Sequence, residues 1–386
     1  MGRKVVTLGV VVPVYNTKSY LEKCIDSIIH QSFTDIKVVL VDDGSTDGSA
    51  EICDNFASAD NRVYVLHQKN QGKLAARYNG VKCLNTDYVT FVDSDDWLDL
   101  DAYMKLAEYM EKGIDIISFM IIRSHEKYCA KSRSYFPFGE YTSEKIKNYI
   151  IPNMIWDYDE NRFGLDPSLC NKIIKRDIVL SVLSKVKYMS ISYGDDMAVV
   201  YPLMKKINTF VLINEYLYYH RQRKSDEIAP YYLDKDYYPK LAMLYSWLKA
   251  EFEGDDCLIE QIDRFFFEST KYRMKLYKSN QSFYGIFPFD KIPYRSKIIL
   301  YGASDIGREY YAQIKKLNYA EVVLWVDINF DKYTSLVIKS PAEIGDEIQY
   351  DYVVVAVKTR EVAEEIKDYL VNKKNVKSDK VIWSYK

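Results

Sequence analysis

The amino-acid sequence predicts an α/β protein in which a mostly parallel, doubly wound sheet is followed by a helical connector and a small Rossmann-like α/β unit. Three observations support this class. Short β-branched segments alternate with amphipathic ones over the first hundred residues, polar clusters stand where those strands end, and a strand–glycine turn–helix pattern returns near residue 300. The 386 residues leave room for two or three domains of ~150 residues. We expect them at 1–227, 228–292 and 293–386.

Strands and helices alternate regularly at the start of the chain. Residues 5–12 are almost continuously β-branched, as expected of a strand buried on both faces. Ser19 and Glu22 have the spacing of a capping box, which predicts a helix. Further strands are expected at 36–41, 63–66 and 88–92, with a helical segment before each. This alternation predicts parallel strands whose carboxyl ends share one edge of the sheet, where ligands bind.

Polar clusters follow three of these strands. The first strand ends in Pro13-Val14-Tyr15-Asn16, the second in Asp42-Asp43 and the fourth in Asp93-Ser94-Asp95-Asp96. Carboxylates packed this closely repel one another unless a cation or hydrogen-bond donors offset their charge. A hard divalent cation bridging to a phosphate is one solution. The other is a solvated turn that caps the helix expected near Leu100.

Two cationic residues begin the helix that follows Gly72. Lys73 and Arg77 are four residues apart, and this helix should open on the same side of the sheet as the acidic clusters. A helix N-terminus with cationic side chains is a favourable place for a diphosphate. An exposed basic pair without a ligand is the alternative.

In the C-terminal part of the chain, residues 228–290 are rich in Tyr, Phe, Leu and Lys with helical spacing, which predicts a helical segment. A shortened Rossmann-like unit is expected after it. In that unit a strand at 298–301 leads into Gly302–Gly307, and Asp327 follows at the distance of a ribose contact. Ser304 replaces the middle glycine of the dinucleotide-binding pattern. We therefore expect the unit to bind a nucleotide or nucleotide sugar, or only to mediate association, and an NAD-linked oxidoreductase is one alternative function.

Composition excludes several classes of protein. Lys and Arg number 53 against 55 Asp and Glu, for a net charge of −2, which argues against nucleic acid as a partner. Six cysteines show no paired spacing, which predicts reduced thiols. Neither a charged-then-apolar leader nor a run of ~18 apolar residues is present. We therefore expect a cytoplasmic protein.

Four motifs in this order resemble those of family 2 glycosyltransferases of the GT-A fold, over residues 5–225. They are Val-Val-Pro13-Val-Tyr15-Asn16, Val-Asp42-Asp43-Gly44-Ser45-Thr46-Asp47, Asn70-Gln71-Gly72 with Arg77, and Asp93-Ser94-Asp95-Asp96. The resemblance implies an inverting transfer of one sugar from a nucleotide-diphosphate sugar to an acceptor hydroxyl, in the synthesis of a bacterial surface polysaccharide.

The resemblance also implies roles for residues at the donor. Asp95, with Asp93 nearby, would hold Mg²⁺ or Mn²⁺ against the diphosphate, and Lys73 and Arg77 would assist. Tyr15 would stack on or flank the base. Asp43 would accept a hydrogen bond from the ring N–H, which favours uracil over adenine, although thymine offers the same edge. The same motifs would supply the rest of the donor pocket from Pro13, Val14, Asn16, Gly72 and Ser94.

The proposed general base lies in Gly194-Asp195-Asp196, which resembles the Gly-Glu-Asp motif of the family. Asp196 matches its last residue and is the expected base, with Asp195 as the second choice. This chain departs from the pattern because Asp195 replaces Glu. The alternative is that both aspartates cap the following helix.

The segment from Tyr218 to Ser225 resembles the part of the family that closes over the diphosphate. Arg221 and Arg223 would clamp phosphate oxygens, and His220 is either a further metal ligand or a packing residue. The pair Asn171-Lys172 falls where related enzymes bind the acceptor or donor sugar.

The resemblance predicts a saccharide or a lipid-linked saccharide as acceptor. A lipid-linked acceptor would place the enzyme at the inner face of the plasma membrane, with a peripheral association. Self-association through residues 293–386 and a non-catalytic nucleotide-sugar binding protein are further options.

Overall fold

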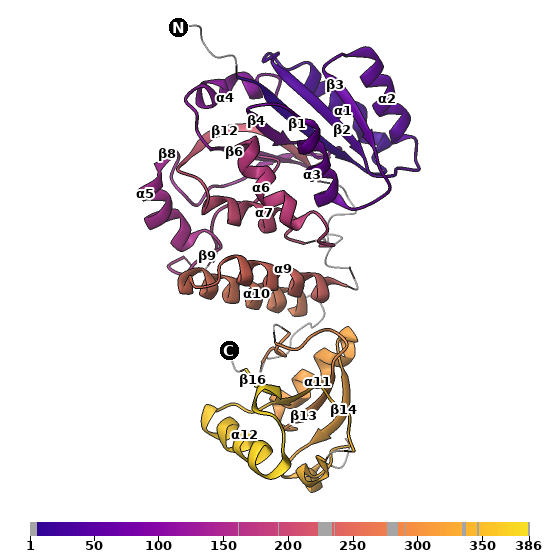
Figure 1. The fold of residues 1–386 in the computed structure, drawn as a ribbon, viewed down its shortest axis with the longest axis vertical. Helices are drawn as coiled ribbons and strands as arrows, with labels where there is room; N and C mark the ends of the chain where they lie inside the picture. Colours follow the sequence, from indigo (N-terminus) through magenta and orange to yellow (C-terminus); the bar gives the residue numbers. More distant parts are fainter. Residues whose placement is uncertain are drawn as a thin grey trace. The chain divides into compact units, whose positions relative to one another are not determined.

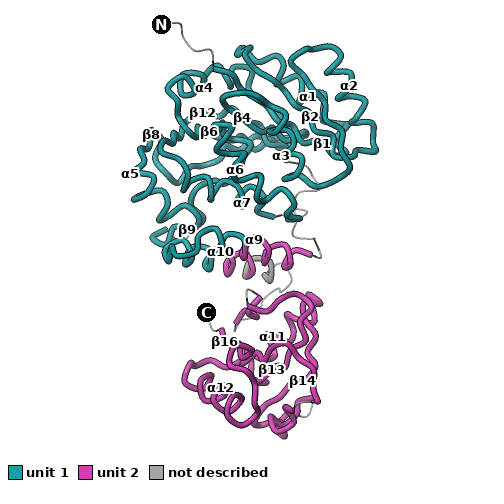
Figure 2. The backbone as a smooth tube through the Cα atoms, viewed as in Figure 1, with its two compact units in different colours: residues 1–233, 247–265 teal, residues 234–246, 266–386 magenta. Residues whose placement is uncertain are grey.

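The computed structural model describes residues 6–160, 162–191, 193–222, 234, 236–275, 285–289, 291–333, 337–345 and 347–384. The chain divides into two compact units, shown in Figure 2. Unit 1 comprises residues 1–233 and 247–265, and unit 2 comprises residues 234–246 and 266–386. The division falls inside two helices, α9 (Tyr237–Glu251) and α10 (Asp256–Lys275). The three-domain division at residues 227 and 292 stays a prediction.

The first half of unit 1 is a parallel sheet with helical crossovers (Figure 1). Its strands lie in the order β3-β2-β1-β4, and all three pairs are parallel. They are β1 (Leu8–Val14), β2 (Ile36–Asp42), β3 (Val63–His67) and β4 (Tyr88–Phe91). The crossovers are α1 (Lys18–Ile29), α2 (Ser49–Ala59) and α3 (Lys73–Cys83). Every residue of β1 is buried, as the β-branched run predicts.

The second half extends the same sheet and introduces antiparallel pairs. Strand β11 (Lys172–Lys175) runs antiparallel between β4 and β6 (Ile116–Ser124), and β12 (Thr209–Arg221) is parallel to β6. Short strands complete it: β5 (Trp97–Leu98), β7 (Cys129–Lys131) and β8 (Gly139–Thr142). Because β11 is antiparallel to β4, the loop before Lys172 reaches the edge where β4 ends.

The remaining elements of unit 1 are short. The helices are α4 (Ala102–Glu111), α5 (Ser143–Lys145), α6 (Arg176–Val186) and α7 (Asp195–Met204), with a π-helical turn at Ile146–Ile150 and a 3₁₀ turn at Ile151–Asn153. Strands β9 (Trp156–Asp157) and β10 (Arg162–Phe163) form a separate antiparallel pair. Helix α3 packs against both β1 and α6. Gly80 permits this approach to the sheet, since a Cβ there would lie 2.4 Å from a methyl carbon of Val11.

Unit 2 contains a second parallel sheet, in the order β14-β13-β15-β16. Its strands are β13 (Lys297–Tyr301), β14 (Glu321–Val326), β15 (Tyr352–Val355) and β16 (Val381–Trp383), and its helices are α11 (Asp305–Leu317) and α12 (Arg360–Lys374). Single 3₁₀ turns lie at Phe330–Lys332, Pro341–Glu343 and Ser378–Lys380. The predicted α/β class with a mainly parallel sheet is confirmed.

Two further features bear on the sequence-based expectations. All six cysteines are free thiols, and Cys24, Cys53 and Cys170 are buried. Within the described ranges, no helix has both the length and the apolar character that are needed to cross a bilayer.

Candidate active site

The loops that follow β1, β2 and β4 meet at one edge of the unit 1 sheet. The register pairs Val14 with Asp42, so β1 and β2 end side by side. Hydrogen bonds then join the loops: Thr17 Oγ1 donates to Ser94 Oγ at 3.0 Å, and the Thr46 amide donates to Asn16 Oδ1 at 2.8 Å. Asn16 has a positive φ of 51°, a conformation that asparagine tolerates better than most residues. The three polar clusters of the sequence therefore form one surface.

Arg77 is the centre of an ion-pair network at this edge. Its side chain is fully buried, and it contacts Asp93 Oδ1 at 3.2 Å, Asp195 Oδ2 at 3.1 Å and Asp196 Oδ1 at 2.5 Å. Lys73 Nζ lies 2.9 Å from Asp93 Oδ2. The alternative of an exposed basic pair is wrong for Arg77, whose guanidinium joins carboxylates from two distant parts of the chain.

Burial and charge oppose each other throughout this network. Burial disfavours the ionised forms of Arg77 and Asp93, yet the surrounding carboxylates raise the pKa of Arg77, while Lys73 and Arg77 lower the pKa of Asp93 below its usual range. At Asp196, burial dominates and raises the pKa, although Arg77 acts in the opposite direction. Asp93 is thus held as an anion, whereas Asp196 is the more basic carboxylate.

Asp195 and Asp196 occupy the first turn of α7. The N-cap residue is Gly194, with φ 79° and ψ 20°, so no side chain caps the helix from that position. Asp196 Oδ2 instead accepts a hydrogen bond from the Leu169 amide at 3.2 Å. Both carboxylates thus bind Arg77, and their place in the first turn also lets them stabilise the N-terminus of α7.

The acidic cluster after β4 does not cap a helix, since the N-cap of α4 is Asp101. It is followed by β5, and α4 begins only at Ala102. Asp96 is 2% exposed, and its carboxylate accepts hydrogen bonds from Tyr218 Oη at 2.7 Å and the Arg221 amide at 2.7 Å. Burial, then Asp93 and Asp95, raise the pKa of Asp96. Asp96 is consequently a structural anchor for the end of β12.

Arg221 lies against the same acidic turn. Its Nε donates to the Asp95 carbonyl at 2.8 Å, and its guanidinium carbon lies 4.7 Å from the Tyr20 ring centre and 4.8 Å from that of Trp97. These contacts fix Arg221 beside Asp95. Arg223, the other predicted phosphate contact, lies outside the described residues.

His220 lies between the acidic turn and β6. Burial lowers its pKa, while Asp93 and Asp95 act in the opposite direction, so a neutral imidazole is favoured, the form that binds metals. Its Nδ1 contacts the side-chain Nε2 of Gln222. Among the described residues, no group of three or more His, Cys, Asp or Glu side chains is arranged to hold a metal ion. The donor set still fits Mg²⁺ or Mn²⁺ held by one or two carboxylates together with substrate phosphates.

The predicted base-binding residues border the same edge. Asp43 is 4% exposed and orders the loop before α3, since it accepts hydrogen bonds from Gln68 Nε2 at 2.7 Å and from the amides of Gln71 and Gly72 at 2.8 and 2.9 Å. Tyr15 is 52% exposed. Pro13 and Val14 are buried in β1, so they offer the site backbone atoms only.

Asn171 and Lys172 are buried in the protein interior. Lys172 has no exposed surface, and Asn171 Nδ2 donates to the Phe119 carbonyl at 2.9 Å. The Lys172 ammonium binds protein oxygens of the loop at 166–171. The two side chains therefore support a loop and do not line the surface formed by the three clusters.

Several residues that complete the site carry no clear signal in the sequence. Tyr218 joins Asp96 to the backbone of the acidic turn, since its hydroxyl also accepts from the Asp93 amide at 3.1 Å. His67 contacts Asp42 Oδ2 at 3.0 Å and Asp54 Oδ1 at 3.1 Å. Tyr218 belongs to the segment that was expected to close over the diphosphate, but the sequence assigned no function to its hydroxyl. Nothing in the sequence around His67 indicated that it would contact two carboxylates.

In unit 2, the turn from Gly302 to Gly307 is packed tightly against nearby residues of the same unit. Asp327 Oδ2 accepts from the Ala303 amide at 2.7 Å, and Trp325 Nε1 donates to the Gly302 carbonyl at 2.8 Å. A Cβ on Gly307 would lie 2.0 Å from the Gly302 oxygen. These contacts account for the glycines and for Asp327 without a bound cofactor.

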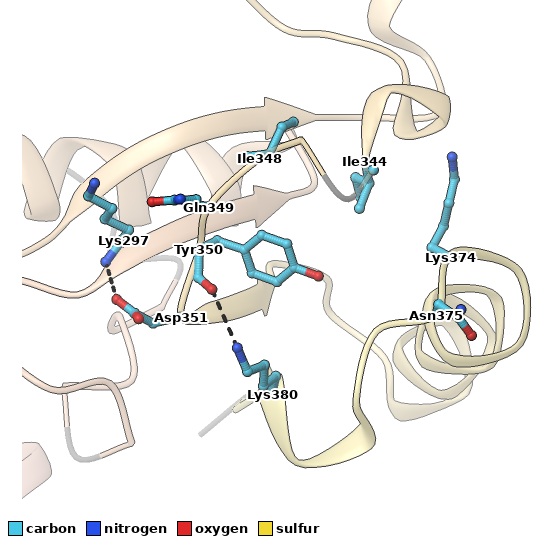
Figure 3. A pocket seen from close by; sticks show the side chains of 10 residues that line it. Lys297, Ile344, Ile348, Gln349, Tyr350, Asp351, Lys374, Asn375 and Lys380 are labelled. Carbon is cyan, nitrogen blue, oxygen red and sulfur yellow. Dashed lines mark hydrogen bonds between the residues drawn. The ribbon is translucent and has the colours of Figure 1, made fainter.

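A cavity of about 360 Å³ in unit 2 opens at the other end of the strands (Figure 3). Lys297, Asp351 and Lys380, which line it, stand at or just before the first residues of β13, β15 and β16. Asp351 accepts from the Lys297 amide at 2.8 Å, and Lys380 Nζ donates to the Tyr350 carbonyl at 3.4 Å. None of the predicted site residues lines this cavity.

Known proteins match the chain in both sequence and fold. The family model described as Glycosyl transferase family 2 matches residues 9–174. Glycosyltransferase GlyG of Streptococcus pneumoniae is 33% identical over 224 residues, which are 56% of this chain and 71% of GlyG. Glycosyltransferase GlyA of the same organism is 50% identical over 106 residues, 26% of this chain, but the match spans only 15% of GlyA.

Among solved structures, S. aureus TarS 1–349 in complex with UDP-GlcNAc matches with a TM-score of 0.51 and 21% identity, over 71% of this chain and 76% of that one. At this identity the likeness concerns the fold, and it confirms the predicted GT-A architecture. The family model and the match to GlyG thus define an enzyme of the glycosyltransferase class. The chain belongs to glycosyltransferase family 2.

Proposed function

We propose that this glycosyltransferase moves one sugar from a uridine-diphosphate sugar to an acceptor hydroxyl, with inversion at the anomeric carbon. The observation that carries the proposal is the network in which Arg77 joins Asp93, at the end of β4, to Asp195 and Asp196, at the start of α7. It brings a basic carboxylate next to the edge where a donor diphosphate would lie.

Asp196 is the proposed general base. Each of its oxygens has one described donor, Arg77 on Oδ1 and the Leu169 amide on Oδ2, and a carboxylate oxygen has a second lone pair to accept a proton. Asp196 would take the proton of the acceptor hydroxyl while that oxygen attacks the anomeric carbon. The bond from that carbon to the diphosphate oxygen breaks, and the diphosphate leaves with the electron pair.

The charge at this edge supports a role for a divalent cation. Asp93, Asp195 and Asp196 share Lys73 and Arg77 as their described cationic partners, and a diphosphate adds further negative charge. Asp95 and Asp93 would hold Mg²⁺ or Mn²⁺, with His220 as a further candidate ligand. When bound, the cation would neutralise charge that develops on the leaving diphosphate.

Asp43 and Tyr15 support uridine as the base. Asp43 Oδ1 accepts two described hydrogen bonds and Oδ2 one, which leaves an acceptor position for a ring N–H. The exposed ring of Tyr15 offers a stacking surface. The TarS structure with the same fold is a complex with UDP-GlcNAc, which is in keeping with this choice.

The proposed acceptor is a saccharide or lipid-linked saccharide of a bacterial surface polysaccharide, modified on the cytoplasmic side of the membrane. This part rests on the family resemblance of the motifs between Pro13 and Asp96.

Thermal unfolding with UDP, GDP and ADP, each with Mn²⁺ or with EDTA, tests the donor site. We expect UDP with Mn²⁺ to raise the Tm most, because a ligand at 100 times its Kd stabilises the folded state by about 2.7 kcal/mol. Asp43→Asn should remove the preference for UDP, since its amide donates where the carboxylate accepts. Equal shifts with all three nucleotides would contradict the uridine assignment, and an unchanged shift in EDTA would contradict the metal.

A further inference from the structure

Lys172 is buried, and the described hydrogen bonds of its ammonium all go to one loop. The residue has no exposed surface, and its Nζ donates to the Asp166 carbonyl at 2.8 Å, the Ser168 carbonyl at 2.8 Å and Asn171 Oδ1 at 2.9 Å. An ammonium has three protons, so its donors are fully used. Lys172 therefore cannot contact a sugar or phosphate without giving up one of these bonds.

A charge in this position is costly to bury. Burial lowers the pKa of Lys172, although the nearby Asp166 and Asp196 act in the opposite direction, and its three hydrogen-bond acceptors are neutral oxygens. Burying an ammonium in this way disfavours folding unless its hydrogen bonds compensate. An apolar side chain would fill the space at less cost, but it would not hold the two carbonyls of the loop.

The loop from Asp166 to Asn171 contacts the proposed base, Asp196. Asp166 Oδ1 accepts from the Ser168 amide at 2.9 Å, which tightens the turn, and the next amide, that of Leu169, donates to Asp196 Oδ2 at 3.2 Å. Arg77 holds the other oxygen of Asp196. The orientation of this carboxylate thus depends on Arg77 from α3 and on the loop that Lys172 holds.

We propose that Lys172 is a positioning residue for the transfer reaction: it fixes the loop at 166–171 so that the Leu169 amide orients the carboxylate of Asp196. The inference rests on the proposed function, in which Asp196 accepts the acceptor proton. Misplacing a catalytic group by about 1 Å is sufficient to slow a reaction about 10²-fold.

Lys175, on the same strand, provides a matched control. Its Nζ pairs with Asp115 Oδ1 at 2.7 Å, and Asp115 in turn accepts from the amides of Asn208 and Thr209. Lys175 thus stabilises unit 1 through contacts that do not include Asp196. A merely structural role for Lys172 would give Lys172→Met and Lys175→Met the same kinetic behaviour at equal folded fraction.

The test compares both Met variants in the wild-type and Asp196→Asn backgrounds, in the full chain. We expect Lys172→Met to lower kcat about 10²-fold per folded molecule, with the Kd for UDP and Mn²⁺ within about twofold, while Lys175→Met retains kcat. In the Asp196→Asn background, Lys172→Met should cause no further loss, because both act through one carboxylate. A normal kcat for Lys172→Met, or fully additive losses, would overturn the proposal.

Hydrogen exchange gives a readout that does not need activity. The Leu169 amide should exchange at least about tenfold faster in Lys172→Met than in wild type, and at the wild-type rate in Lys175→Met. Unchanged protection in Lys172→Met would also overturn the proposal. If Lys172→Met does not fold, Lys172→Gln, which keeps a donor group, replaces it under the same criteria. Absence of transfer by the wild type would instead refute the proposed function and leave the exchange comparison valid.

Discussion

The two sheets end in loops of opposite character. In unit 1, Asp93 in the loop after β4 meets Lys73 and Arg77 of α3, and Arg77 also pairs with Asp195 and Asp196 of α7, so three carboxylates share two described cations. In unit 2, the turn after β13 is closed by Asp327, Trp325 and a tight glycine contact. The same parallel architecture therefore carries the proposed reaction site in one unit and a tightly packed turn in the other. Side chains on the loops, and not the fold, decide between the two.

The largest expected effect comes from the base in unit 1. Asp196→Asn should lower kcat by about 10²–10⁴-fold, because the amide cannot accept the proton of the acceptor hydroxyl. Asp327→Asn, which changes the aspartate at the corresponding edge of unit 2, should leave kcat unchanged. Steady-state transfer assays at matched folded fraction measure both. Near-normal turnover by folded Asp196→Asn would remove Asp196 from the mechanism.

Arg77 should dominate the stability of the unit 1 edge. Arg77→Ala leaves three carboxylates close together without their shared cation, and removing one partner from a buried ion pair costs about 3–5 kcal/mol. Urea unfolding followed by a probe in unit 1 measures the loss. Lys73→Ala, which removes one partly exposed pair with Asp93, is the control and should cost less than about 1 kcal/mol. Equal losses in the two variants would refute the central role of Arg77.

Gly307→Ala tests the packed turn of unit 2. The added Cβ would overlap the Gly302 carbonyl oxygen, and overpacking of this kind costs about 1–3 kcal/mol. Gly345→Ala is the control, since a Cβ there meets nothing within 4 Å. We expect a lower midpoint for a probe in unit 2, with the transfer rate at low temperature unchanged. A specific loss of kcat would show that the turn takes part in the reaction.

The smallest effect is a pH dependence at His67. Hydrogen bonds to Asp42 and then Asp54 raise the pKa of this histidine in the folded state. The stabilisation is thus complete below its ordinary pKa of about 6.5 and is lost as the pH rises through the higher folded value. Because the pair is partly exposed, we expect wild type to exceed His67→Gln by less than about 1 kcal/mol at pH 5.5.

The comparison for this prediction is the same pair of proteins at pH 8.5. There the difference in unfolding free energy between wild type and His67→Gln should shrink toward zero. A difference that grows with pH would contradict protonation of His67 between the two carboxylates.

Much of the fold was predictable because its signals are local. The buried run of β1 and the alternation with helices follow from periodicity, and Asp93 and Asp196 could be proposed as site residues because each stands in a short motif. The pairing of Arg77 with Asp195 and Asp196 was not predictable, since it joins residues more than a hundred positions apart. The spacing of Lys73 and Arg77 indicated phosphate ligands, whereas the described contacts of Arg77 are carboxylates.

Lys172 is a second residue whose surroundings could not be predicted from local sequence. The motif indicated a sugar contact for Asn171 and Lys172, but the register of β11 between β4 and β6 buries both side chains. Which face of a strand a lysine occupies depends on tertiary pairing, and a short strand of four residues carries no periodicity from which to read it. The sequence of unit 2 resembled that of a cofactor-binding domain because glycines occur both where the backbone approaches a phosphate and where two backbone segments pack closely.

The ion-pair network around Arg77 also affects the order in which the chain folds. One ion pair, with Asp93, is available within the first hundred residues, but the partners at 195 and 196 are synthesised much later. A nascent chain that ends before α7 would have to leave the guanidinium of Arg77 solvated or bury it with too few partners. The strands β1 to β4 can therefore pair early, whereas the edge that carries the chemistry is completed only when the chain returns to it.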